Sequence, residues 1–266
     1  MEYENNRLKE VLTVENEKTK NNYSMSSIHR LIQVLRAFSA DYPKLSLTEI
    51  SRRTDISISS LQRIVNTLVY EGFLVKDEKT KRYSLGLELM FLGQLVEKND
   101  ALLSKAVPIM EELNQETQEN VSLNIIDGDQ RRCIYNLPSR HELAALTFVG
   151  NTSPLYAGAS AKSLLAFQSD AFIKSYIESV TLTKITDITV ESKADLLQQL
   201  YESRNKGYAL TKGERVKGAT SISVPIFAHN QLLLGALSVT FPYIRYGEYD
   251  IEHLISLLKQ ASQRIS

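Results

Sequence analysis

The stretch 46–86 constrains the fold more than any other part of the chain, because it predicts two short helices, a tight turn between them and a two-stranded hairpin. Ser46 and Glu49 have the S-x-x-E spacing of a capping box, which begins the first helix. Asp55 stands in the turn, where the backbone needs a residue that tolerates positive φ. Gly72 ends the second helix, whose buried stripe is Leu61, Ile64, Val65 and Leu68. This order is that of a winged helix-turn-helix.

The opposite face of the second helix is polar and carries no acid. Such side chains can hydrogen-bond base edges in a major groove or bind phosphates, and the basic hairpin suits phosphate contact. Gln62 and Arg63 are the best candidates for contact with bases or phosphates. The full predicted DNA-binding set is Ser57, Ser59, Ser60, Gln62, Arg63, Asn66, Lys79, Lys81 and Arg82. The alternative is an ordinary helical hairpin whose polar face is only solvated.

The bulk composition limits the class of protein. A chain of 266 residues with no net charge suits two domains and argues against a general polyanion binder. Residues 26–86 still contain ten Lys and Arg against six Asp and Glu, a local basic surplus typical of site-specific DNA binding. No apolar run reaches the roughly 20 residues of a membrane span, and the single Cys133 excludes an internal disulfide. We expect a cytoplasmic protein with no membrane partner.

The pattern divides the chain into four regions. Residues 1–24 predict a flexible arm, 25–86 the winged helix-turn-helix, 87–104 a linker helix and 105–266 a ligand-sensing domain. The apolar side chains of the linker helix indicate packing against a partner subunit. A further helix at 27–38 is expected to bury Ile28, Leu31, Ile32, Leu35 and Phe38.

The carboxy-terminal region contains both helix and strand patterns. The helices are predicted at 107–118, 160–168, 170–179, 193–206 and 249–265, and the strands at 121–126, 133–137, 145–150, 219–227 and 232–241. A mixed sheet flanked by helices is typical of a ligand-sensing domain. The predicted fold class is therefore α+β, with a winged helix-turn-helix, a linker helix and an α/β ligand-sensing domain.

Several motifs resemble the IclR family of bacterial transcriptional regulators over about residues 26–265. They are ISISSLQRIVNTLVYEGFL and YSLG, followed by PLYAGASAKSLLAF, NKGYAL, GATSISVPIF and GALSVTFP. Each motif alone is weak, but their order and intervals together match the family. The resemblance implies that the effector-binding domain is GAF-like, that the protein forms dimers or tetramers, and that it responds to small organic acids or related metabolites.

The same resemblance implies an effector pocket at the start of the PLYAGASAK helix, where backbone N–H groups would hold a carboxylate. The implied pocket residues are Ala157, Gly158, Ala159, Thr211, Ser221, Ser238 and Thr240. Thr211 replaces an acid common in the family and Ser221 replaces a common cysteine, which puts the family's best-known ligands in question. The alternative is that the strand hydroxyls only face neighbouring strands.

No residue pattern predicts catalysis, a metal site or a cofactor. Ser160 and Lys162 could form a nucleophilic dyad, but two residues apart on a helix they point away from each other. Lys162 and Glu214 match family motifs. For Lys162 a structural or interface role is favoured over ligand contact, and for Glu214 both a structural role and a role in the pocket stay open. The four histidines lack metal-ligand spacing. An anion site could be formed by Arg131, Arg132, Arg140 and His141, but a solvated hairpin and loop is the favoured interpretation.

The sequence thus predicts a homo-oligomeric regulator, a repressor rather than an activator. It would bind double-stranded operator DNA and change its operator affinity when a small organic acid binds. Three alternatives stay open. The protein could respond to a partner protein rather than to a metabolite. The helix-turn-helix could serve protein contact beside a sensing domain of enzymatic ancestry, or the protein could be a Ser/Lys hydrolase-type enzyme.

Overall fold

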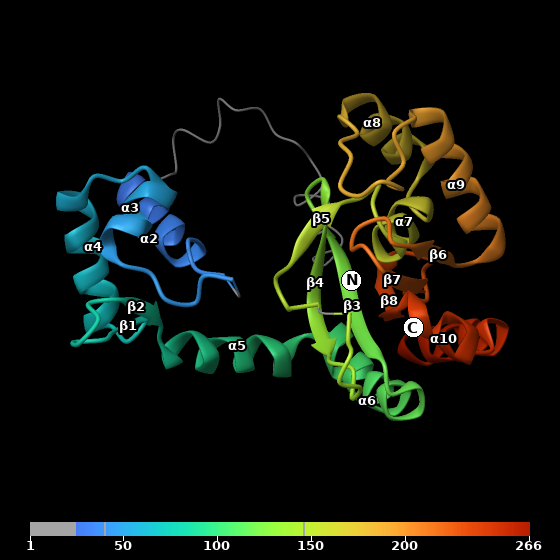
Figure 1. Cartoon of the computed structure of the whole chain (residues 1–266), viewed down its shortest axis with the longest axis horizontal. Coiled ribbons are helices and arrows are strands. Elements are labelled where there is room, and N and C mark those ends of the chain that lie inside the picture. Colours follow the sequence, from blue (N-terminus) through green and yellow to red (C-terminus); the bar gives the residue numbers. More distant parts are fainter. Residues whose placement is uncertain (1–24, 40, 146) are drawn as a thin grey trace. The chain divides into compact units, whose positions relative to one another are not determined.

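The structure is a computed structural model that describes residues 25–39, 41–145 and 147–266. The arm predicted at residues 1–24 lies outside these described residues. The chain divides after Asn99 into two compact units (Figure 1). The first is built mainly of short helices, and the second is built around one sheet.

The amino-terminal unit confirms the predicted winged helix-turn-helix. Its elements are α2 (Ser26–Arg36), α3 (Leu47–Thr54), α4 (Ile58–Tyr70), β1 (Leu74–Lys76), β2 (Tyr83–Leu85) and α5 (Leu87–Asn99). β1 and β2 pair antiparallel and form the wing. Three helices and the wing share one apolar core, which contains Val34, Ile50, Leu61, Val65, Leu68 and Leu74.

Local sequence explains where α3 begins and ends. The Ser46 backbone N–H donates to Glu49 Oε2 at 2.7 Å, and the Glu49 backbone N–H donates to Ser46 Oγ at 3.3 Å, which is the predicted capping box. Asp55 ends the helix with a left-handed φ of 55°. Because Asp tolerates this conformation, the tight turn into α4 forms without glycine.

The buried stripe of α2 differs from the predicted one. Ile28 and Ile32 are 51% and 38% exposed, whereas Val34 is fully buried. The side chains that face α3 and α4 are Leu31, Val34, Leu35 and Phe38. Both stripes have helical spacing, so periodicity alone could not choose between them, and the rotation is decided by packing against the neighbouring helices.

The linker helix is shorter than predicted. α5 ends at Asn99 rather than at residue 104, because Asp100 caps the next helix by accepting a hydrogen bond from the Leu103 backbone N–H at 2.8 Å. No side chain of α5 is buried. Its exposed large apolar residues are Leu87, Met90, Phe91, Leu92, Leu95 and Val96.

The carboxy-terminal unit contains a six-stranded sheet in the order β5-β4-β3-β8-β7-β6. The strands are β3 (Asn120–Asp127), β4 (Gln130–Leu137), β5 (Thr152–Pro154), β6 (Ala209–Lys212), β7 (Ala219–Phe227) and β8 (Leu233–Pro242). Every pairing in this sheet is antiparallel, so the predicted mixed sheet was wrong. Short connections such as the one between β3 and β4 permit hairpins, whereas parallel neighbours need long crossovers.

The strand predicted at 145–150 was also wrong. The edge strand is β5, which follows that segment and pairs with β4. The apolar Phe148 and Val149, which suggested a strand, are 44% and 61% exposed in a loop. Gly150 turns this loop with a φ of 89°, and its backbone N–H donates to the Cys133 carbonyl oxygen.

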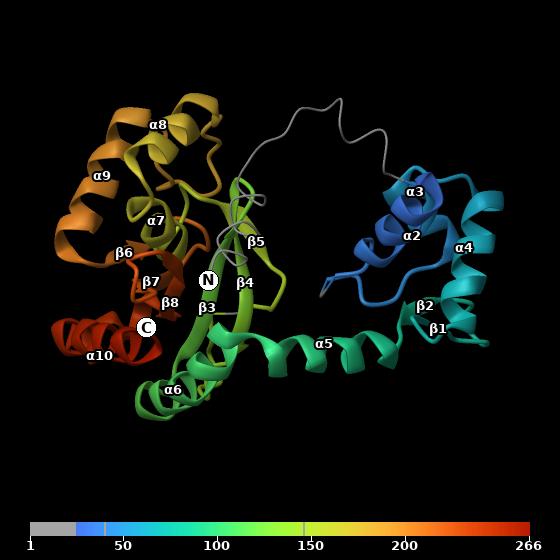
Figure 2. The ribbon, with the colours of Figure 1, turned by 180° about the vertical axis from the view of Figure 1, so that it is seen from behind.

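The two faces of the sheet are covered by different helices (Figures 1 and 2). α6 (Ala101–Thr117) and α10 (Ile251–Ile265) pack on an apolar face together with Ile222, Val224, Leu237 and Val239. α7 (Ala159–Ala166) lies on the other face, with α8 (Asp170–Ser179) and α9 (Lys193–Lys206) packed around it, and a short 3-10 helix η1 (Tyr243–Glu248) precedes α10. Successive strand residues face opposite sides, so the intervening Ser221, Ser223, Ser238 and Thr240 face α7.

Candidate nucleic-acid interface and effector pocket

The exposed face of α4 carries polar side chains and no carboxylate. Gln62, Arg63 and Asn66 are all exposed, and Gln62 Nε2 donates to Asn66 Oδ1 at 3.0 Å. Arg63 forms no ion pair among the described residues. Its guanidinium can therefore bind a base edge or a phosphate without first losing an intramolecular partner.

The amino terminus of α4 is also suited to an anion. Ser57 is the N-cap, yet its side chain makes no cap hydrogen bond and lies near the hydroxyls of Ser59 and Ser60 instead, at 3.4 and 3.2 Å. The first turn holds no acid. Backbone N–H groups at such a terminus attract phosphate oxygens.

The three predicted wing cations have different surroundings. Lys79 is exposed and has no ion pair among the described residues, while Lys81 Nζ pairs with Glu78 Oε2 at 2.8 Å. Arg82 is bound on both sides, because Nη1 lies 3.1 Å from Glu49 Oε2 and also donates to the Lys44 carbonyl oxygen at 3.0 Å. Arg82 therefore connects the wing to α3, a structural role that sequence reasoning did not assign.

The same contacts act on the capping carboxylate. Hydrogen bonds from the backbone and hydroxyl of Ser46, followed by the charge of Arg82, lower the pKa of Glu49.

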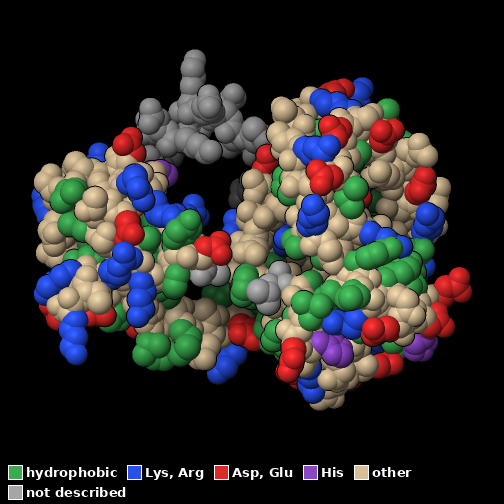
Figure 3. All heavy atoms as spheres, in the orientation of Figure 1, with side chains coloured by type: hydrophobic (Ala, Val, Ile, Leu, Met, Phe, Trp, Pro, Cys, Tyr) green, Lys and Arg blue, Asp and Glu red, His purple; other side chains and the backbone are tan. Residues whose placement is uncertain are grey.

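Two basic residues at the end of α3 were missed as candidates. Arg52 is exposed without an ion pair among the described residues, and Arg53 lies over the Tyr42 ring at 3.7 Å. Figure 3 shows Lys and Arg side chains spread over the visible face of this unit.

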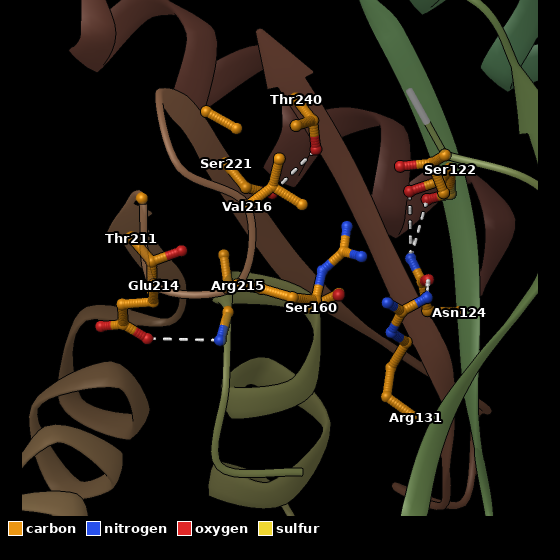
Figure 4. Close-up of a pocket in the computed structure, with 15 residues that line it drawn as sticks. Ser122, Asn124, Arg131, Ser160, Thr211, Glu214, Arg215, Val216, Ser221 and Thr240 are labelled. Carbon is orange, nitrogen blue, oxygen red and sulfur yellow. Dashed lines mark hydrogen bonds between the residues drawn. The ribbon is translucent and has the colours of Figure 1, made fainter. Parts of the chain in front are cut away.

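The carboxy-terminal unit contains a polar pocket between the sheet and the start of α7 (Figure 4). Thr211, Ser221 and Thr240 stand opposite one another on β6, β7 and β8, and the last two hydroxyls lie 2.9 Å apart. Ser122 and Asn124 of β3 line the far side.

Of the seven pocket residues implied by the sequence, five line this hollow, namely Gly158, Ala159, Thr211, Ser221 and Thr240. Ala157 is buried in the apolar cluster beneath α7 and α9. Ser238 is one register position deeper, where its hydroxyl donates to Ser223 Oγ at 2.8 Å. The interpretation of a strand hydroxyl facing another strand therefore holds for Ser238.

A buried ion pair supports the start of α7. Lys162 Nζ lies 2.6 Å from Glu214 and donates to Gln199 Oε1 at 2.5 Å, while the Gly158 backbone N–H donates to Glu214 Oε2 at 3.2 Å. Burial lowers the pKa of Lys162, and the charge of Glu214 opposes that shift. The ammonium is thus committed to Glu214 and Gln199 rather than to Ser160, which removes the basis for a Ser–Lys dyad.

Two arginines that sequence reasoning did not assign to the pocket also line it. Arg131 of β4 and Arg215 of the loop after β6 turn their guanidinium groups toward each other in Figure 4. Arg131 is 1% exposed and donates to Ser153 Oγ, Asn124 Oδ1 and the Asn151 carbonyl oxygen. Burial, and then the charge of Arg215, lowers the pKa of Arg131 to about 10.

The solvated-hairpin interpretation of this region was right for one arginine and wrong for its neighbour. Arg132 Nε pairs with Asp127 at 2.5 Å on the surface, whereas Arg131 is buried. Strand alternation sends consecutive side chains to opposite faces, and Arg131 shares its buried face with Cys133. That alternation was the available signal. For Arg215, in a loop, no sequence signal existed.

Within the described part of the chain, no three His, Cys, Asp or Glu side chains gather as metal ligands. In the same residues, no helix is both long and apolar enough to cross a membrane.

Together, an exposed acid-free helix face and a separate polar pocket define a DNA-binding regulator with a ligand-sensing unit. The comparisons specify the family. Residues 27–78 match the IclR helix-turn-helix domain, and residues 94–266 match the bacterial transcriptional regulator IclR C-terminal domain. The transcriptional regulator KdgR of Escherichia coli is 30% identical over 243 residues, which cover 91% of this chain and 92% of that protein. The chain therefore belongs to the IclR family of bacterial transcriptional regulators.

Solved structures agree in fold. An IclR regulator from Alicyclobacillus acidocaldarius superposes with a TM-score of 0.84 at 24% identity and covers 92% of this chain and 98% of that one. An IclR homologue from Microbacterium hydrocarbonoxydans, complexed with 4-hydroxybenzoate, gives a TM-score of 0.79 at 24% identity, with coverage of 90% and 97%. At this identity the likeness shows a common fold.

Proposed function

We propose that this regulator inserts α4 into the major groove of operator DNA and that a small organic acid in the pocket changes its operator affinity, with repression as the output. The observation that carries the DNA-binding half is the exposed polar face of α4, on which Arg63 has no ion pair among the described residues. Ser57, Ser59 and Ser60 would hold phosphates from the helix start and Lys79 from the wing.

Self-association completes the DNA-binding proposal. Two copies of α4 would occupy successive major grooves of a near-palindromic site, about 34 Å apart or a multiple of that distance. The uncovered apolar side chains of α5 support a homo-oligomer, since exposed apolar surface of this kind is typical of subunit contacts.

The pocket supports an acid as the effector. Arg131, Arg215 and the first turn of α7 give it a positive lining, and hydroxyls from three strands supply further hydrogen-bonding groups. The Microbacterium homologue complexed with 4-hydroxybenzoate is in keeping with this class of ligand. A cytoplasmic location follows from the proposed role at DNA.

Selection of genomic DNA fragments at near-physiological salt tests the proposal. Purified wild-type protein should enrich a near-palindromic site, and Arg63→Ala should lose most of that enrichment. Arg264→Ala is the matched control, because this exposed arginine belongs to the carboxy-terminal unit, where it pairs with Glu112. Equal enrichment by the wild type and Arg63→Ala would contradict the assigned DNA-binding face.

Response to a partner protein is the competing input. If no small acid raises the melting temperature of the protein or changes its operator affinity, a partner protein becomes the better account, since any ligand of the native state stabilises it by mass action.

A further inference from the structure

Two buried or half-buried guanidinium groups face the same pocket without a carboxylate partner. Arg131 bonds only neutral oxygens, and its Nη2 is buried with no hydrogen-bond partner among the described residues. Arg215 forms no hydrogen bond or ion pair within the described residues, although it lies close enough to Arg131 for their charges to interact. A buried donor that lacks a partner is costly, so its presence in a pocket points to a missing acceptor.

The pocket also has an uncompensated charge of two. Glu214 is the one acidic side chain among the described residues that line it, and its carboxylate is already paired with Lys162 at 2.6 Å and bonded by the Gly158 N–H. Lys162 and Glu214 therefore cancel, whereas Arg131 and Arg215 remain. Two like charges repel each other, the more so because Arg131 is buried, and a bound anion removes that repulsion.

The number of negative charges on the ligand decides how completely the repulsion is removed. A monocarboxylate neutralises one guanidinium and leaves the other desolvated. A dicarboxylate neutralises both, because one carboxylate can accept from the unpartnered Nη2 of Arg131 and the other from the guanidinium of Arg215. Ala159 and Ser160, in the first turn of α7, also line the pocket, and the amino terminus of a helix favours negative charge.

We propose that the pocket selects small dicarboxylates over monocarboxylates of the same chain length, with Arg131 and Arg215 each binding one carboxylate. This inference rests on the proposed function, since it specifies the charge class of the effector in the same pocket. Thr211, Ser221 and Thr240 then contact the part of the ligand between the two acid groups or a hydroxyl or oxo group carried by it.

Calorimetric titration of the full-length protein with paired probes tests the preference. Succinate is compared with butyrate and glutarate with pentanoate, so that each pair differs by one carboxylate at constant carbon number. Inorganic phosphate, which is a single compact anion, tests whether the pocket requires two carboxylates that are spaced apart. For at least one chain length, the dicarboxylate should bind about tenfold or more tightly than its monocarboxylate partner. Equal affinity within every pair, or tighter binding of phosphate than of every dicarboxylate, would overturn the inference.

Variants connect the preference to the two arginines. Arg215→Gln should bring the ratio of affinities within each pair close to one, and because Arg215 lies in a loop, this change avoids the folding risk of altering buried Arg131. Arg132→Gln is the control, since Arg132 itself pairs with Asp127 outside the pocket, and this variant should keep the wild-type ratio. A preference that survives Arg215→Gln would contradict the assignment.

Operator affinity, measured with the same probes, separates this inference from the proposed function. If monocarboxylates bind as well as dicarboxylates and change operator affinity, the charge class is wrong and the proposed function stands. If no probe acid, including 4-hydroxybenzoate, binds or changes operator affinity, both are overturned.

Discussion

The DNA-binding face and the effector pocket both gather positive charge, but they hold it in opposite ways. Arg63 and Lys79 are exposed and remain hydrated until a ligand arrives. Lys162 and Arg131 are 2% and 1% exposed, so each must find compensation inside the protein or in a ligand. The carboxylate of Glu214 compensates the charge of Lys162, whereas no carboxylate among the described residues compensates the two pocket arginines. Exposed cations can therefore be removed with little effect on folding, while buried cations are coupled to stability.

The largest expected effect comes from a substitution that breaks the buried ion pair between Lys162 and Glu214. Glu214→Ala leaves the Lys162 ammonium buried without its counter-charge, and loss of one partner of such a pair costs about 3–5 kcal/mol of the free energy of unfolding. Urea denaturation measures it. Glu112→Ala, which breaks the exposed pair with Arg264, should change the free energy of unfolding far less.

A double variant distinguishes the loss of a charge partner from the loss of packing. Lys162→Met combined with Glu214→Leu removes both charges and should recover much of the stability lost in Glu214→Ala. If the double variant is no more stable than Glu214→Ala, the pair is not the reason for the loss.

The second effect concerns the exposed face. Arg63→Ala should weaken binding to the selected operator by about 1–3 kcal/mol if the guanidinium contacts a base, with no comparable loss in the urea midpoint. Titration of labelled operator by fluorescence anisotropy measures the affinity. A fall in stability as large as the fall in affinity would remove the contrast between the two regions.

The third effect tests local structure in the amino-terminal unit. Ser46→Ala removes the hydroxyl that accepts the Glu49 backbone N–H, so the amino-terminal unit should lose about 1 kcal/mol of stability. Hydrogen exchange at the α3 amides measures it locally. Ser46→Thr keeps the hydroxyl and should stay near the wild type, so an equal loss in both variants would point away from the cap.

These two regions also show where sequence reasoning works. The helix-turn-helix could be predicted because caps, turn and periodicity are local, as the capping box and the left-handed Asp55 demonstrate. The predicted bounds of α8, α9 and β7 coincide with the observed ones for the same reason. The α2 stripe could not be chosen locally, because the neighbouring helices decide which face is buried.

The pocket depends on contacts between distant segments, and sequence reasoning recovered only part of it. Strand residues Thr211, Ser221 and Thr240 follow from family motifs and line it. Ser238 looks equivalent in sequence, yet the register places it opposite Ser223. Arg215 enters from a loop, where no periodicity indicates direction. The sequence alone does not predict which charged side chains find an ion-pair partner in the folded protein.

The smallest expected effect distinguishes two neighbouring wing lysines. Lys79 has no ion pair among the described residues, whereas Lys81 is 2.8 Å from Glu78. If Lys79 binds a phosphate, Lys79→Ala should weaken binding to operator and unrelated DNA alike and reduce the slope of log affinity against log salt by about one. Lys81→Ala should change that slope less, because an intramolecular carboxylate already partly neutralises its ammonium. Anisotropy titrations between low and near-physiological salt measure both slopes, and equal slopes for the two variants would mean that pairing with Glu78 does not withhold Lys81 from DNA.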